Sequence, residues 1–95
     1  MTDLEKKNYY NILFGYYGVL LTEKQQYYFE DYYFNNYSLA EIAENNKTSR
    51  NAIHKQVKEV ENKLIDYEDK LKLYQKASEI EEIIKDLDEN IKEQI

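Results

Sequence analysis

The absence of proline is the feature that most constrains the fold of this chain. The 95 residues include no proline and only two glycines, Gly15 and Gly18. Proline and glycine are the residues that most often interrupt helices and form tight turns. Their scarcity permits long, uninterrupted helices and disfavours folds made of short strands joined by turns. The sequence therefore predicts an all-α protein.

The composition further limits the class of protein. An apolar fraction of 42% supports a folded core, and 95 residues suffice for one domain with an appended helix. The chain has no cysteine, which excludes disulfides, thiol catalysis and cysteine zinc sites. No apolar signal segment opens the sequence, and no stretch is long enough to span a membrane. We expect a cytoplasmic protein with no membrane partner.

Local patterns predict where the helices begin. Apolar residues recur at helical spacing over residues 4–20. Three later segments have the capping-box pattern, in which a hydroxyl and a Glu or Gln three residues on satisfy free amides: Thr22–Gln25, Ser38–Glu41 and Ser78–Glu81. The third lies close to a phase break in the apolar pattern. The final segment is therefore either a separate helix that folds back or part of one continuous rod.

Residues 38–57 have the spacing of a helix-turn-helix. Ala43 is small enough for two helices to cross closely, and Ile53, ten positions later, is the expected buried anchor. The turn falls at Asn45–Lys47, where asparagine tolerates the left-handed conformation. Ser49 is the expected N-cap of the second helix.

The first turns of that second helix are the candidate nucleic-acid-binding site. Residues 49–63 carry four cations and two acids, whereas the segments on either side are acidic and the whole chain has a net charge of −6. The only arginine, Arg50, has the fork geometry that matches phosphate or a guanine edge, although it could instead pair with Glu41 or Glu44. The predicted contacts to DNA or RNA are Ser49, Arg50, Asn51, His54, Lys55 and Lys58. We expect the two lysines to touch phosphates and Ser49 to cap the helix.

Nothing in the sequence is typical of an enzyme or a cofactor site. It contains no activated nucleophile, no glycine-rich phosphate loop and no metal-ligand spacing. The single histidine, His54, lacks a cysteine or a paired acid to work with. We predict no catalytic residue, no cofactor and no metal. Nine of the eleven tyrosines fall in residues 9–37 at helical spacing, which indicates core and interface packing.

An apolar seam continues beyond the helix-turn-helix. It alternates spacings of four and three from Ile53 to Tyr74, and resumes one residue out of phase from Leu73 to Ile91. A helix over residues 50–75 would be about 40 Å long, more than a compact body of this size covers. A second copy of the chain is the simplest partner, although the first part of the seam could be core of one protomer. The predicted homodimer interface is Leu64, Tyr67, Leu71, Tyr74, Ile80, Ile84 and Leu87.

These patterns divide the chain into two predicted domains. Residues 1–63 form a helical domain that includes the helix-turn-helix, and residues 64–95 form a C-terminal helical dimerisation extension.

Five segments also follow one another in the order and spacing of a known family: Leu21–Gln25, Tyr32–Tyr33, Ser38–Glu44, Ser49–Ile53 and Tyr67–Leu71. On these segments the chain resembles the YlxM family, small helix-turn-helix proteins similar to region 4 of sigma factors. The resemblance implies an all-helical dimer with a sigma region 4-like fold. It also implies a regulatory role in the signal recognition particle pathway, with the particle's GTPase or RNA as a partner.

The chain departs from the family pattern in two places. The turn usually has an apolar residue, a glycine or polar residue, and a valine or isoleucine, where this chain has Asn46, Lys47 and Thr48. Lys58–Glu59 stands in place of a lysine–arginine pair. The first change removes buried contacts and the second weakens a phosphate contact. Two functions therefore stay open, beside a third alternative, a purely structural dimer with no ligand. The first is a regulatory nucleic-acid-binding protein, and the alternative is a protein–protein interaction module that docks on signal recognition particle components without autonomous DNA binding.

Overall fold

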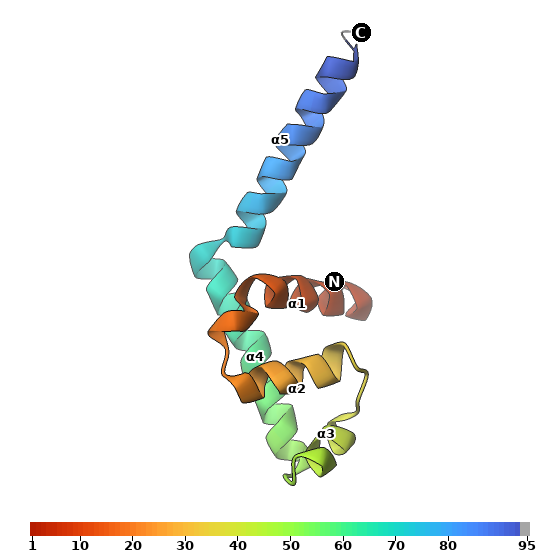
Figure 1. The fold of residues 1–95 in the computed structure, drawn as a ribbon, viewed down its shortest axis with the longest axis vertical. Helices are drawn as coiled ribbons and strands as arrows, with labels where there is room; N and C mark the ends of the chain where they lie inside the picture. Colours follow the sequence, from red (N-terminus) through yellow and green to blue (C-terminus); the bar gives the residue numbers. More distant parts are fainter. Residues whose placement is uncertain (94–95) are drawn as a thin grey trace.

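The computed structural model describes residues 1–93 and is helical throughout (Figure 1). The elements in chain order are α1 (Asp3–Tyr17), the short 3₁₀ helix η1 (Gly18–Leu20), α2 (Glu23–Tyr33), α3 (Leu39–Asn45), α4 (Arg50–Leu71) and α5 (Leu73–Glu93). The described residues contain no strand, so the predicted all-α class is confirmed. Residues 94 and 95 of the predicted extension lie outside the described residues.

Side-chain caps begin most of these helices, and three of them were predicted. The Thr22 hydroxyl accepts from the Gln25 amide at 3.2 Å, and the Ser38 hydroxyl accepts from the Glu41 amide at 3.1 Å. In both cases the second residue's side chain accepts in return from the amide of the cap residue, which completes the capping box. The third capping-box prediction is wrong, because Ser78 lies inside α5.

The turn between α3 and α4 uses a lysine where asparagine was predicted. Lys47 has φ 54°, the left-handed conformation, whereas Asn46 has φ −105°. The Asn46 side chain instead donates to the Ile42 carbonyl at 2.7 Å and closes the end of α3. The Thr48 amide donates to the Ala43 carbonyl at 3.0 Å. Hydrogen bonds therefore hold this turn.

The core lies where α1, α2 and α3 pack against one side of α4 (Figure 1). α4 contributes four buried apolar residues at helical spacing: Ile53, Val57, Val60 and Leu64. Facing them are aromatic residues of α1 and α2, including a stack of Phe14 on Phe29 with ring centroids 4.4 Å apart. Burial of such aromatic groups is the main source of stability in a small helical domain.

The helical path is interrupted between α4 and α5 at Lys72, which has the left-handed φ of 54°. Two buried side chains hold this break. The Glu68 carboxylate and the Tyr17 hydroxyl accept from the free amides of residues 73–75 at distances of 3.1 to 3.2 Å, and Tyr17 donates to Glu68 at 2.5 Å. Such bonds satisfy the amides that would otherwise be unpaired at the start of a helix. α5 therefore begins at residue 73 and extends away from the other helices (Figure 1).

Neither a folded-back final helix nor a continuous rod is observed. The molecule measures 63 × 25 × 22 Å because α5 projects from the body. The division predicted after residue 63 falls inside the continuous helix α4, and the structural break lies nine residues later at Lys72.

The predicted dimer residues divide into two groups. Leu64 is fully buried in the protomer's own core, so its assignment to a dimer interface is corrected. Tyr67 packs on Tyr17, and Tyr74 packs on Tyr9 and Tyr16, with ring centroids 5.9 to 6.1 Å apart. The other four are exposed: Leu71, Ile80, Ile84 and Leu87. Tyrosines of α1 thus cover the seam at Tyr67 and Tyr74, whereas Leu71 and the predicted interface residues from Ile80 onward are exposed.

Candidate nucleic-acid interface

The turn between α3 and α4 fixes the direction in which α4 begins. Ala43 and Ile53 are both buried in the common core, so the two helices meet across the bend as the spacing predicts. Ser49 is the N-cap of α4, and its hydroxyl accepts from the Ala52 amide at 3.1 Å. The other amides of the first turn are the positive end of the α4 dipole. This end of the helix can receive a phosphate.

The predicted contact residues share the solvent side of this helix end. Arg50, Asn51, His54, Lys55 and Lys58 are all exposed, as is the cap residue before them. The buried residues of α4 begin at Ile53, so Arg50 and Asn51 precede the part of the helix that packs in the core. The six predicted residues are therefore all accessible in the first turns of α4, a region hereafter called the α4 outer face (Ser49, Arg50, Asn51, His54, Lys55 and Lys58).

Arg50 is available to a ligand. Within residues 1–93 its guanidinium forms no ion pair, so the alternative pairing with Glu41 or Glu44 does not occur. Glu41 instead accepts from the Ser38 amide at 3.2 Å as part of the capping box of α3.

Lys58 has a partner that the sequence analysis missed. Its Nζ lies 3.2 Å from Oε1 of Glu61, a buried acid whose other oxygen accepts from the Tyr33 hydroxyl. Glu61 lies four residues after Val57 and three before Leu64, so the spacing of the buried face could have identified it. The Lys58 side chain is 61% exposed and stays accessible to phosphate. Part of its charge nevertheless neutralises Glu61.

Burial and the neighbouring Glu61 carboxylate both raise the pKa of the Tyr33 hydroxyl. Burial raises the pKa of the Tyr33 hydroxyl first, and its hydrogen bond to the Glu61 carboxylate raises that pKa further. Burial and the same carboxylate also raise the pKa of Tyr10, against a smaller opposing effect of Lys58. Tyr33 therefore acts as a neutral hydrogen-bond donor that connects α2 to α4.

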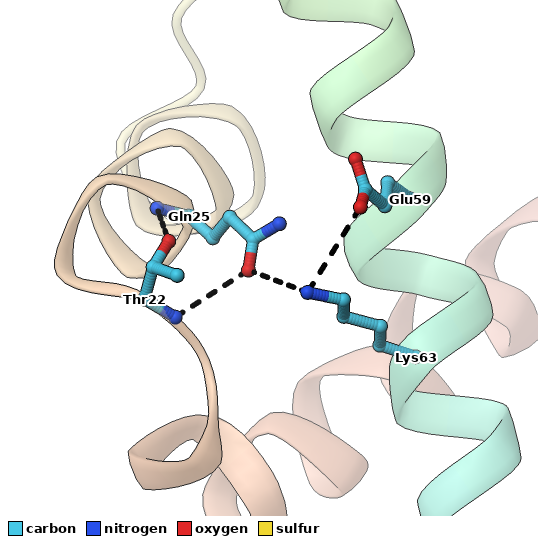
Figure 2. Close-up of polar contacts among 4 residues, drawn as sticks. All are labelled: Thr22, Gln25, Glu59 and Lys63. Atoms are coloured by element: carbon cyan, nitrogen blue, oxygen red, sulfur yellow. Dashed lines mark hydrogen bonds and ion pairs between the residues drawn. The ribbon is translucent and has the colours of Figure 1, made fainter.

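Lys63, the last cation of the positive segment, is directed toward α2 (Figure 2). Its Nζ donates to Oε1 of Gln25 at 3.2 Å and lies 3.9 Å from Glu59. The same Gln25 oxygen accepts from the Thr22 amide at 3.4 Å, so one carbonyl joins the cap of α2 to α4 (Figure 2). The cations that remain on the outer face are Arg50, Lys55 and Lys58.

Residues 1–93 offer neither a cluster of metal ligands nor a membrane-spanning helix. Histidine, aspartate and glutamate side chains nowhere gather in groups of three or more that could hold a metal ion. In the same part of the chain, no helix combines the length and the apolar character needed to cross a membrane.

Comparison with known proteins gives a consistent result. Residues 4–95 match the family described as "Putative helix-turn-helix protein, YlxM / p13 like". A UPF0122 protein of Streptococcus suis (strain 98HAH33) is 50% identical over 72 residues, which are 76% of this chain and 64% of that protein. UPF0122 proteins of Streptococcus mutans and Streptococcus gordonii are likewise 50% identical over 72 residues, 66% of their length. The matched part therefore spans just under two thirds of these curated relatives.

Proposed function

This chain belongs to the UPF0122 family of YlxM/p13-like helix-turn-helix proteins, and on that basis we propose that it binds nucleic acid through the α4 outer face. The observation that carries the proposal is the position of Arg50. The only arginine stands exposed and without an acidic partner among residues 1–93, at the first position of a capped helix that follows a tight turn. In helix-turn-helix proteins this end of the second helix enters the major groove.

Each residue of the outer face has a distinct proposed role. Arg50 bonds a phosphate or a guanine edge through its guanidinium, and Asn51 and His54 present donors and acceptors beside it. Lys55 and Lys58 contact phosphates, which supply most non-specific affinity. Ser49 holds the helix end in place, so the backbone amides there can also bond a phosphate.

A second copy of the chain completes the proposed assembly. Along α5 the apolar residues of the seam are exposed: Leu73, Ile80, Ile84, Leu87 and Ile91. They repeat with spacings typical of a coiled coil, on a helix that projects from its own body (Figure 1). A twofold pair of α5 helices buries both stripes and presents two α4 outer faces to one nucleic acid.

The proposal is tested by fluorescence anisotropy at low salt, with labelled duplex DNA and labelled RNA as separate probes. Loss of one bidentate arginine contact is worth about 1 to 3 kcal/mol, so we expect Arg50→Ala to weaken binding by about fivefold to about 150-fold. Arg50→Lys keeps the charge but loses the fork, and should recover only part of the affinity. Lys85→Ala on α5 removes one charge far from the site and serves as the control. If neither the DNA probe nor the RNA probe binds, the proposal is refuted.

A second candidate function is a protein-interaction module that docks on the signal recognition particle, its GTPase or its RNA. The family resemblance implies a role in the pathway of that particle. Two observations favour it. The chain has a net charge of −6, and Lys58 and Lys63 both have partners within the fold. Co-purification with those components that survives Arg50→Glu would support this function over groove reading. A pull-down that recovers neither the GTPase nor the RNA would count against it.

A further inference from the structure

A polar cleft lies next to the α4 outer face. It is formed by the first turns of α1, the turn between α2 and α3, and the middle of α4. Three lysines line it, Lys6 and Lys7 from α1 and Lys58 from α4, together with tyrosines that include Tyr10 and Tyr37. These side chains come from segments about fifty residues apart in the sequence, so their proximity is a product of the fold.

We propose that this α1–α4 cleft is a second phosphate-binding subsite, which holds the phosphodiester strand as it leaves the α4 outer face. Lys6 and Lys7 are the phosphate contacts that this subsite adds. The inference rests on the proposed function, because it extends the same nucleic-acid surface onto a different helix.

The cleft and the outer face form one continuous surface. Lys58 lines the cleft, and it also lines the shallow depression on the solvent side of α4 together with His54 and Lys55. Lys58 belongs to both, so a strand bound over His54 and Lys55 can pass by Lys58 into the cleft. Phosphates repeat along a nucleic-acid strand, so successive phosphates of one strand can bind Lys6, Lys7 and Lys58 at the same time. A ligand with a single carboxylate could not reach all three lysines.

The charge of the cleft is opposite to that of the chain. It holds three lysines against Asp3 and Glu61, a net charge of +1 in a protein of net charge −6. One of the two acids is already neutralised, because Glu61 is buried, accepts from Tyr33 and pairs with Lys58. The field that an approaching anion meets is therefore dominated by Lys6 and Lys7.

The walls of the cleft favour a charged ligand in a fixed place. The Lys7 Nζ donates to Oδ1 of Asn36 at 3.3 Å, which holds the ammonium group over the cleft before any ligand arrives. The half-buried rings of Tyr10 and Tyr32 also line the cleft, and they lower the local dielectric, so each lysine–phosphate attraction is stronger than on open surface. Tyrosine hydroxyls add neutral donors for phosphate oxygens.

The test is the salt dependence of binding in the full chain. Probes are a labelled duplex DNA of ~20 base pairs and a labelled single-stranded RNA of ~20 nucleotides, titrated between about 50 and about 200 mM salt. A Lys6→Gln/Lys7→Gln variant loses two phosphate contacts. The negative slope of log K against log salt should therefore become less steep, by about 1.8 on duplex and about 1.4 on single strand. On duplex DNA, the advantage of the wild type should then shrink by about tenfold across that range.

Two further variants separate this subsite from a general effect of charge. Lys6→Arg/Lys7→Arg keeps both cations and should keep the wild-type slope. Lys70→Gln/Lys85→Gln removes two cations away from the cleft and should also leave the slope unchanged. If the wild type binds a probe and Lys6→Gln/Lys7→Gln has the wild-type slope, or the control lowers the slope equally, the cleft is not a phosphate subsite. Absence of wild-type binding to both probes would instead refute the proposed function itself and, with it, this inference.

Discussion

Two buried carboxylates join α4 to tyrosines of the neighbouring helices. Glu61 accepts from Tyr33 of α2, and Glu68 accepts from Tyr17 of α1. Burial of a carboxylate is unfavourable unless hydrogen bonds compensate for the lost water. Glu68 meets that requirement with the tyrosine hydroxyl and two backbone amides of α5. Each tyrosine is therefore both a core residue and the donor that makes a buried acid tolerable.

Removal of one hydroxyl should expose that dependence. Tyr17→Phe leaves the ring in place but takes one donor from Glu68, and a hydrogen bond to a charged group contributes about 1.5 to 3 kcal/mol. We expect the free energy of unfolding, measured by urea denaturation, to fall by that amount. Tyr27→Phe is the control, because its hydroxyl bonds Glu23 on the exposed side of α2. Equal effects of the two substitutions would contradict this role of Tyr17.

The same pairs predict a loss of stability in alkali. Burial, followed by hydrogen bonds to Glu68 and Glu61, raises the pKa of Tyr17 and of Tyr33 above the usual value of about 10. Below pH about 10 neither state of the protein ionises these tyrosines, so their contribution is complete. Above it the unfolded chain ionises first and is favoured. Stability should therefore fall as pH rises from about 10, and fall less steeply in Tyr33→Phe. A pH-independent unfolding midpoint up to pH about 11 would contradict this linkage.

At the scale of the elements, two lysines occupy backbone positions that usually favour glycine. Lys47 in the α3–α4 turn and Lys72 at the α4–α5 break both have φ 54°. A side chain in this left-handed region costs about 1 kcal/mol or more, which glycine avoids. The extra freedom of glycine in the unfolded chain offsets part of the gain.

Glycine should therefore be tolerated at the turn and not within the helix. We expect Lys47→Gly to leave the free energy of unfolding unchanged or to raise it by up to about 1 kcal/mol. Lys55→Gly, at an exposed interior position of α4, should lower it by about 1 kcal/mol. Denaturant midpoints of the two variants measure the difference. A loss at Lys47 as large as the loss at Lys55 would show that the turn does not hold the described conformation.

The caps and the helix-turn-helix could be predicted because their chemistry is local. Thr22, Ser38 and Ser49 each bond an amide three residues away, and such pairs are visible in the sequence. The end of α4 could not be predicted, because Tyr17 lies 51 residues before the Glu68 that it bonds there. Ser78 has the pattern of a cap without its structure, since no turn precedes it.

The sequence predicted which residues of α4 are exposed, but it did not predict which other helices pack beside them. The period of three and four placed Ile53 inside and Lys55 outside, as observed. Arg50 lies three residues before Ile53, in register with the buried residues, and is exposed because it is the first residue of α4. The period could not show whether the seam near Leu64 is covered by α1 or by a second copy, because both give the same apolar spacing. Nor did it place Lys6 and Lys7 beside Lys58, since that proximity depends on how α1 crosses α4.

At the scale of the whole molecule, the projecting helix α5 determines the proposed assembly. More than half of the Ile80, Ile84 and Leu87 side chains is exposed, on a helix that only its first turns join to the body. A single exposed helix with such a stripe gains stability when the stripe is buried against another helix. The body can therefore fold as one protomer, while α5 is the element that a second copy should order.

Paired substitutions at adjacent positions test the second copy. Ile84 lies in the stripe and Lys85 lies beside it on the charged side of α5. We expect the wild type to be a dimer by light scattering coupled to gel filtration, and Ile84→Gln to shift it to monomer. Lys85→Gln, which introduces the same side chain one residue away, should remain a dimer. A wild type that is monomeric at every concentration measured would remove the second copy from the proposal.

Nucleic-acid binding by the α4 outer face is best tested by an NMR titration. Backbone amide shifts of the isotope-labelled full chain are followed while a short duplex DNA, and separately an RNA hairpin, is added at low salt. We expect the largest changes at residues 49–58, with Arg50 and Asn51 among them, and smaller changes at Lys6 and Lys7. The amides of α5 should change little. Changes confined to α5, or no change with either probe, would contradict binding through this face.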